Sequence, residues 1–224
     1  MIRRDYILRM IEEFIQALSR IRALKKEQLW SEAATSLDDE FKRLIGAGAQ
    51  AVAQLSQTEL VARLIRGEPT QVVHTKTLLL VTLLQEAGDL ATRQERPEEA
   101  RACYSKGLNL LLYSLAAGEV QEMPEFVPSL EVFVSSLNEA SLPVETNAML
   151  MQHYERTGEF AKAEDALFAM LEAEPKNPRL IKFGIAFYRR LELQNDASLE
   201  TGNLPRAEVE AGLADLRTRE ADIS

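Results

Sequence analysis

Cysteine and histidine are scarce in this sequence, with one cysteine and two histidines among 224 residues. Because Cys103 has no second cysteine to pair with, an internal disulfide is excluded, which fits a reducing compartment. His74 and His153 lie far apart, and no cysteine, histidine or carboxylate recurs at the spacing of a metal site. A glycine-rich phosphate loop and a nucleophile elbow are also missing. The sequence therefore predicts no catalytic residue, no metal site and no cofactor.

Long apolar runs are missing as well. The longest, Leu78 to Leu84, covers 7 residues, whereas a membrane-spanning helix needs about 20. Arg3 and Arg4 are followed by charged positions and not by the apolar core of a signal peptide. We therefore expect a soluble, cytoplasmic chain that has no membrane partner.

Basic residues are fewer than acidic ones. The chain has 26 lysines and arginines and 35 aspartates and glutamates, so its formal net charge is −9. An acidic surface repels phosphate backbones, so nucleic acid is not an expected partner. The basic residues from Arg20 to Lys26 are explained by the preference of cations for the end of a helix. Hydrophobic residues make up 46% of the chain, which is enough to fill a core.

Apolar residues recur with helical spacing along almost the whole chain, and no alternating strand pattern appears. Residues 75–94 are apolar over most of the helix circumference, which indicates a helix sandwiched between neighbours. Residues 195–203 are expected to form a polar loop, after which Pro205 opens a final helix. The sequence predicts an all-α protein of about eight to ten antiparallel helices.

The first of these helices, expected over residues 4–24, carries an apolar stripe in alternating steps of four and three residues. The stripe consists of Ile7, Ile11, Phe14, Leu18 and Ile21. It either covers the chain's own core, which we prefer, or forms the seam of a homodimer. Three heptads are too few to establish a coiled coil.

Two stretches carry residues at the spacings of a helix-turn-helix repeat. In residues 144–177 they are Leu150, Tyr154, Gly158, Phe160, Ala163, Leu167 and Pro175. In residues 81–113 they are Leu84, Gly88, Ala100, Tyr104 and Gly107. This pattern resembles the tetratricopeptide repeat (TPR), and the overall layout also resembles an uncharacterised family of bacterial helical proteins.

The TPR resemblance implies a particular organisation of the chain. Ala100 and Ala163 stand 63 residues apart, which is not a multiple of the roughly 34-residue TPR period. The resemblance therefore implies an irregular TPR-like α-solenoid. Residues 71–224 would form the repeat region, and residues 1–70 would be an N-terminal helical region that packs on it within one continuous domain.

TPR-like repeats commonly hold a peptide on their concave face. On the helix expected from residue 178, Arg179, Lys182 and Arg189 share one side, because steps of three and seven residues return to nearly the same azimuth. These three residues are candidates for binding a carboxylate-rich peptide, or they pair with Glu145 and Glu155 of the preceding repeat.

The leading hypothesis for the function is a protein- or peptide-binding adaptor or scaffold, whose partner the sequence does not name. One alternative is a self-assembling structural protein that dimerises through its first helix. A more remote alternative is an enzyme without a recognisable motif.

Overall fold

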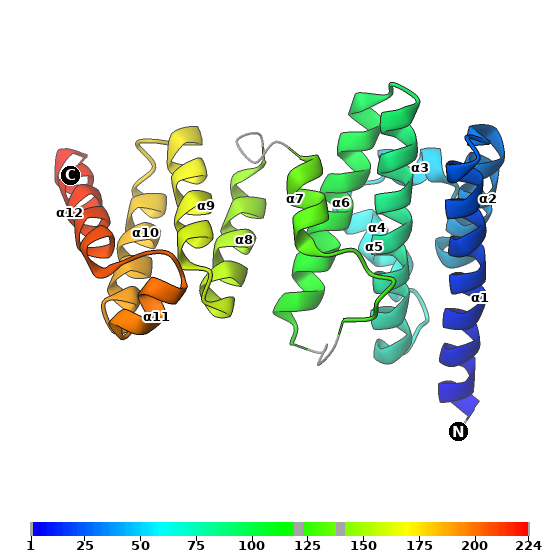
Figure 1. The fold of residues 1–224 in the computed structure, drawn as a ribbon, viewed down its shortest axis with the longest axis horizontal. Coiled ribbons are helices and arrows are strands. Elements are labelled where there is room, and N and C mark those ends of the chain that lie inside the picture. The colour runs from blue at the N-terminus through cyan, green and yellow to red at the C-terminus, as the bar shows by residue number, and fades with distance from the viewer. Residues whose placement is uncertain (1, 119–122, 138–141, 224) are drawn as a thin grey trace. The chain divides into compact units, whose positions relative to one another are not determined.

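A computed structural model describes residues 2–118, 123–137 and 142–223, and every regular element in this part of the chain is an α-helix (Figure 1). The chain divides into two compact units, residues 1–137 and 138–224. The helices of the first unit are α1 (Ile2–Lys26), α2 (Trp30–Ile45), α3 (Ala49–Gln54), α4 (Gln57–Ile65), α5 (Thr70–Arg93), α6 (Pro97–Ala116) and α7 (Leu130–Ser136). Those of the second are α8 (Val144–Thr157), α9 (Phe160–Ala173), α10 (Pro178–Leu191), α11 (Asp196–Thr201) and α12 (Arg206–Asp222).

The core of the first unit is built around α5, which contacts α1, α2, α4 and α6. All residues from Leu78 to Leu84 are buried, including the hydroxyl-bearing Thr82. A helix that is apolar over most of its circumference needs neighbours on several sides. The prediction that this helix is sandwiched is confirmed. Of the helices that precede α5, α1, α2 and α4 contact it directly, and α3 contacts α2 and α6.

The chain crosses the first unit again in an irregular segment, residues 123–129, before α7 begins. This segment contains a turn in which the Val127 N–H donates to the Pro124 carbonyl oxygen at 2.9 Å. The Phe126 ring meets the Phe14 ring of α1 edge to face at 5.6 Å between centroids. The hydroxyl of Thr82 donates to the carbonyl oxygen of Phe126 at 3.2 Å. Phe133 of α7 then packs over Gly107, where an added Cβ would lie 2.4 Å from the phenylalanine ring. The segment and α7 therefore cover α5 and α6.

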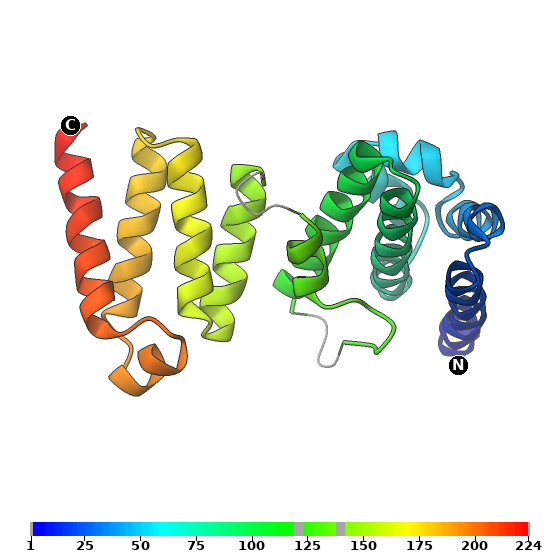
Figure 2. The ribbon, with the colours of Figure 1, turned by 45° about the horizontal axis from the view of Figure 1, so that its top comes forward.

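The second unit consists of the antiparallel pair α8 and α9, followed by α10 and α12, which pack on each other (Figures 1 and 2). Gly158 ends α8 with a φ of 81°, which a residue with a side chain rarely adopts. Pro178 opens α10 at a position that needs no N–H, and the side chain of Asn177 caps that helix. Gly184 lets Leu167 and Leu216 approach α10 from α9 and α12.

The expected all-α class is confirmed, and the described residues form twelve helices where about eight to ten were expected. The described residues form an all-α structure with antiparallel packing, and ten of its helices have seven or more residues. The expected polar loop at residues 195–203 is wrong, because it holds the six-residue helix α11. The Asn195 side chain caps α11 by accepting from the Ser198 N–H at 2.8 Å. In the described part of the chain, no helix combines the length and the apolar character needed to cross a bilayer.

Candidate functional site

The solvent face of α10 carries the three basic residues that the sequence singles out. Arg179, Lys182 and Arg189 are all exposed, whereas the opposite face, including Ile181 and Ile185, is buried. α10 is therefore amphipathic: its basic side chains face solvent, and its apolar face contacts α9 and α12. Their exposure leaves the basic side chains accessible to a ligand.

The expected alternative partners, Glu145 and Glu155, do not pair with these three residues. Glu155 is instead bound by Arg190, whose Nε and Nη2 donate to the two carboxylate oxygens at 2.6 and 2.8 Å. This bond raises the pKa of Arg190 and joins α10 to α8. Within the described residues, Arg179, Lys182 and Arg189 have no ion-pair partner. Their charge is therefore not neutralised by the part of the chain that the structure describes.

An exposed apolar side chain lies just beyond these cations. Leu193 follows α10 and is 86% exposed, the highest value among the large hydrophobic residues described. Exposed leucines are common when they stand alone. Here the leucine lies within one turn of Arg189 and Arg190. We call Arg179, Lys182, Arg189 and Leu193 the α10 face.

The stripe on α1, which the sequence offers as a self-association seam, is largely covered within its own unit. Phe14, Leu18 and Ile21 are buried, and Ile7 and Ile11 are partly buried. α2 and α5 are the helices that pack against α1. The large apolar residues of α1 that remain exposed are Tyr6, Leu8 and Ile15, which are not members of this stripe.

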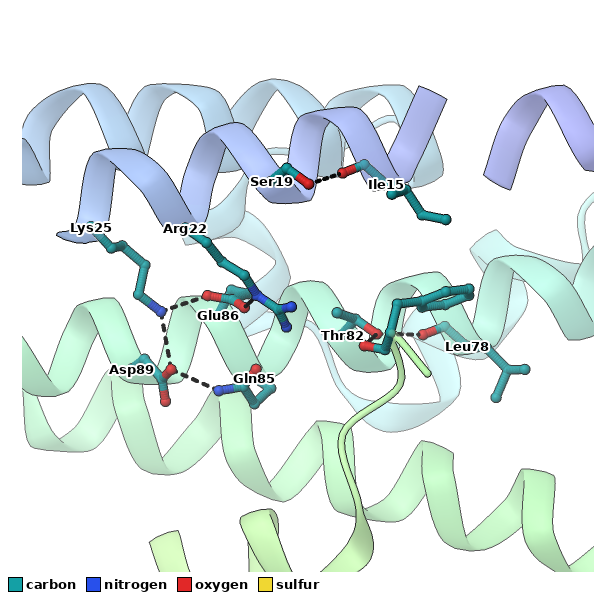
Figure 3. Close-up of polar contacts among 10 residues, drawn as sticks. Ile15, Ser19, Arg22, Lys25, Leu78, Thr82, Gln85, Glu86 and Asp89 are labelled. Carbon is teal, nitrogen blue, oxygen red and sulfur yellow. Dashed lines mark hydrogen bonds and ion pairs between the residues drawn. The ribbon is translucent and has the colours of Figure 1, made fainter. Parts of the chain in front are cut away.

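A buried carboxylate joins α1 to α5 (Figure 3). The side chain of Glu86 is 3% exposed and accepts from Arg22 Nε at 2.6 Å and from Lys25 Nζ at 2.5 Å. Lys25 also contacts Asp89 at 3.0 Å. Arg22 and Lys25, at the end of α1, therefore bind a buried carboxylate of the same unit. Sequence reasoning missed this role, because it explained these cations only by their preference for the end of a helix. The available signal was Glu86 itself, a charged residue two positions after the apolar run from Leu78 to Leu84.

The same network continues to α6 through Tyr104. The Tyr104 hydroxyl donates to Asp89 Oδ1 at 2.8 Å, and burial raises the pKa of Tyr104 to about 12. The ring passes so close to Gly88 that an added Cβ would lie 2.5 Å from it. The partners of these charged groups are other side chains of the unit, so the network holds α1, α5 and α6 together.

The single cysteine and the two histidines are of the types most often found in catalytic and metal sites, and they lie in separate places. Cys103 is buried on α6, and burial raises the pKa of its thiol to about 11, which disfavours the reactive thiolate. His74 lies on α5 in the first unit, and His153 lies on α8 in the second, beside the Tyr154 ring. No group of three histidine, cysteine or carboxylate side chains that could hold a metal occurs within the described ranges.

Comparison with known proteins supplies a family but no function. No curated protein and no solved structure matches the sequence. Residues 1–221, nearly the whole chain, match DUF6483, a family of unknown function. This match agrees with the expected resemblance to an uncharacterised helical family. The chain therefore belongs to the DUF6483 family.

Proposed function

We propose that this protein is a helical-repeat adaptor that binds an acidic segment of a partner protein on its α10 face. The observation that carries the proposal is the set of three exposed cations, Arg179, Lys182 and Arg189, which have no ion-pair partner within the described residues. Other basic residues, such as Arg190 and Lys25, do have carboxylate partners inside the chain. Exposed cations of this kind on a protein of net charge −9 create a local attraction for an acidic partner.

The chemistry of the α10 face suits an acidic peptide that also carries an apolar residue. Arginine presents a planar fork that binds carboxylates through two hydrogen bonds. Charge complementarity mainly accelerates association and selects among partners. Leu193 offers apolar area beside the charges, and a buried apolar contact adds affinity that salt does not screen. The partner segment is therefore expected to combine aspartates or glutamates with at least one apolar side chain.

The TPR-like part of the proposal is supported by close helix contacts at small residues. Ala163 on α9 is completely buried, and Gly158 makes the tight turn between α8 and α9. Gly88 on α5 gives the corresponding close approach to Tyr104 on α6. Small residues at these places let paired helices approach each other closely, as in the repeats that the sequence resembles.

The test compares three folded baits in affinity capture from the source cell lysate. The first is wild type, and the second carries Arg179→Glu, Lys182→Glu and Arg189→Glu. The matched control carries Arg20→Glu, Arg93→Glu and Arg217→Glu, which are also exposed and lower the net charge equally. We expect a partner that the wild type and the control retain and the α10 variant loses, and that moderate salt weakens. Retention of every captured protein by all three baits would contradict the proposal.

A second candidate function, self-association through α1, is favoured by a different observation. Leu8 and Ile15 are 49% and 43% exposed, and they lie seven residues apart on one side of α1. Two such helices could bury these side chains against each other. Light scattering at micromolar concentration tests this candidate. A dimer that becomes a monomer in the Leu8→Glu, Ile15→Glu variant is the expected result, and a monomeric wild type excludes the candidate.

A further inference from the structure

A pocket of about 460 Å³ lies in the first unit between α4, the first half of α5 and the end of α6. Its main apolar walls are Val61, Leu64, Ile65, Val73, Leu110 and Tyr113. No lysine, arginine, aspartate or glutamate is among the described residues that line it, although 27% of the residues in the chain are charged. The volume falls within the range typical of small-molecule pockets.

Most polar side chains in the lining are bonded within the chain, covered or already hydrated. The hydroxyls of Thr77 and Ser114 each donate to a carbonyl oxygen four residues earlier in the same helix. Both polar atoms of the Gln57 carboxamide are buried, so they are out of reach of a molecule in the pocket. Thr58 and Thr70 are exposed, so water can satisfy their hydroxyls. The lining therefore offers a ligand mainly apolar surface.

His74 is the one described lining residue that can carry a positive charge. It is partly buried, and it already interacts with another group of the chain. A carboxylate in the pocket would have to leave water and depend on this single side chain, which is unfavourable. A neutral molecule has no charge to compensate, so the lining favours a neutral ligand over an anion.

We propose that this pocket binds a small neutral molecule that is mostly hydrocarbon and has no charged head group. Removing apolar surface from water, both of the walls and of the molecule, drives such binding. A peptide backbone would instead bring N–H and carbonyl groups that lose water and find few partners in this lining. A small hydrocarbon-rich molecule therefore matches the pocket in size and in polarity.

The ligand would also cover apolar surface that is now open to water. Tyr113 and Ile65 are 55% and 53% exposed, and both belong to the pocket lining. Large apolar side chains left exposed beside a pocket are a feature of ligand-binding sites. The site lies wholly within the first unit and is separate from the α10 face, so it goes beyond the adaptor proposal and does not depend on it.

The test measures binding of N-phenyl-1-naphthylamine, a neutral probe whose fluorescence rises in apolar surroundings, to the full chain. We expect a dissociation constant on the order of 10–100 μM, as is usual for a molecule of this size. Competition then compares 2-acetylnaphthalene with 2-naphthoate, which have equal numbers of heavy atoms, although only the second is charged at neutral pH. The neutral competitor should displace the probe at a roughly tenfold lower concentration, because the carboxylate loses its hydration.

Two double variants separate the pocket from other exposed apolar surface of the first unit. Ile65→Ser with Tyr113→Ser removes two exposed apolar side chains of the lining and should weaken probe binding roughly tenfold. The matched control, Leu8→Ser with Ile15→Ser, removes two similarly exposed apolar side chains of α1 outside the lining and should leave binding unchanged. All four positions are exposed, so both variants should fold.

Three other results would overturn the proposal. The first is undetectable probe binding to the wild type, or equal weakening by the two double variants. The second is stronger competition by 2-naphthoate that is lost in His74→Gln, which would make the pocket an anion site. The third is probe binding per chain that falls as the protein concentration rises, which would show that a second copy of the chain covers the pocket.

Discussion

The ammonium group of Lys25 on α1 lies 2.5 Å from Glu86 Oε2, a carboxylate oxygen of α5 whose side chain is almost completely buried. Arg22, one turn before Lys25, contacts the other oxygen of the same carboxylate at 2.6 Å. A buried carboxylate needs such partners because its desolvation is otherwise very unfavourable. The position of α1 on α5 is therefore specified by charge as well as by the apolar stripe.

Removing the cation should destabilise the first unit. In Lys25→Met, Glu86 keeps only the half-exposed Arg22, so we expect the free energy of unfolding to fall by about 2–3 kcal/mol. Urea unfolding followed by the fluorescence of Trp30, the only tryptophan, reports on this unit. The exposed neighbour provides the control, since Lys26→Met should change the free energy by less than about 0.5 kcal/mol. The double variant Lys25→Met, Glu86→Met should recover most of the loss, and a double variant less stable than the single one would refute this account.

Replacing Gly88 by alanine should destabilise the first unit, although helix propensity alone favours alanine. Alanine is favoured over glycine in a helix by about 1 kcal/mol, yet the Cβ of Gly88→Ala would lie 2.5 Å from the Tyr104 ring. We expect a net decrease of about 1–3 kcal/mol in the free energy of unfolding, because the packed helices must move apart. Trp30 fluorescence in urea measures it. Adding Tyr104→Leu should make the alanine less harmful, and an alanine that stabilises the wild type would contradict the close contact.

Much of the fold could be predicted from local signals in the sequence. Pro97 and Pro178 begin helices because a first-turn position needs no N–H, and Gly158 ends one because it adopts a positive φ. Ser56 and Glu59 form the capping box that their spacing predicts. These features depend on residues within one or two turns of each other, which is why single-sequence reasoning finds them.

Contacts between distant segments could not be predicted in the same way. Lys25 and Glu86 are 61 residues apart, and no local pattern states which cation a carboxylate in an apolar helix will meet. The pocket between α4, α5 and α6 needs three helices to be placed before its walls exist. The three cations of the α10 face were found because they share one helix, where spacing fixes azimuth. Their lack of an ion pair depends on where Glu155 and Arg190 lie, and only the structure gives that.

Tyr104 should make the stability of the first unit depend on alkaline pH. Its pKa is about 12 in the folded state, against about 10 for an ordinary tyrosine. Below about pH 10 both states are protonated. Between about pH 10 and about pH 12 only the unfolded state loses its proton, so the free energy of unfolding falls as pH rises, by about 1–2 kcal/mol. Urea titrations of Tyr104→Phe should lack this component, and Tyr113→Phe, at an exposed position, should retain it.

The single thiol offers a direct measure of opening in the first unit. Cys103 is 3% exposed and its pKa is raised to about 11, so both access and ionisation oppose its reaction with a disulfide reagent. We expect native protein to react with a chromogenic aromatic disulfide at least about a thousandfold more slowly than protein in concentrated guanidinium chloride. The Lys25→Met variant should react faster than wild type by the factor that its loss of unfolding free energy implies, because the thiol becomes accessible through unfolding of that unit. The control Lys26→Met should react at the wild-type rate. Rapid stoichiometric labelling of the native wild type would show that the thiol is accessible without unfolding.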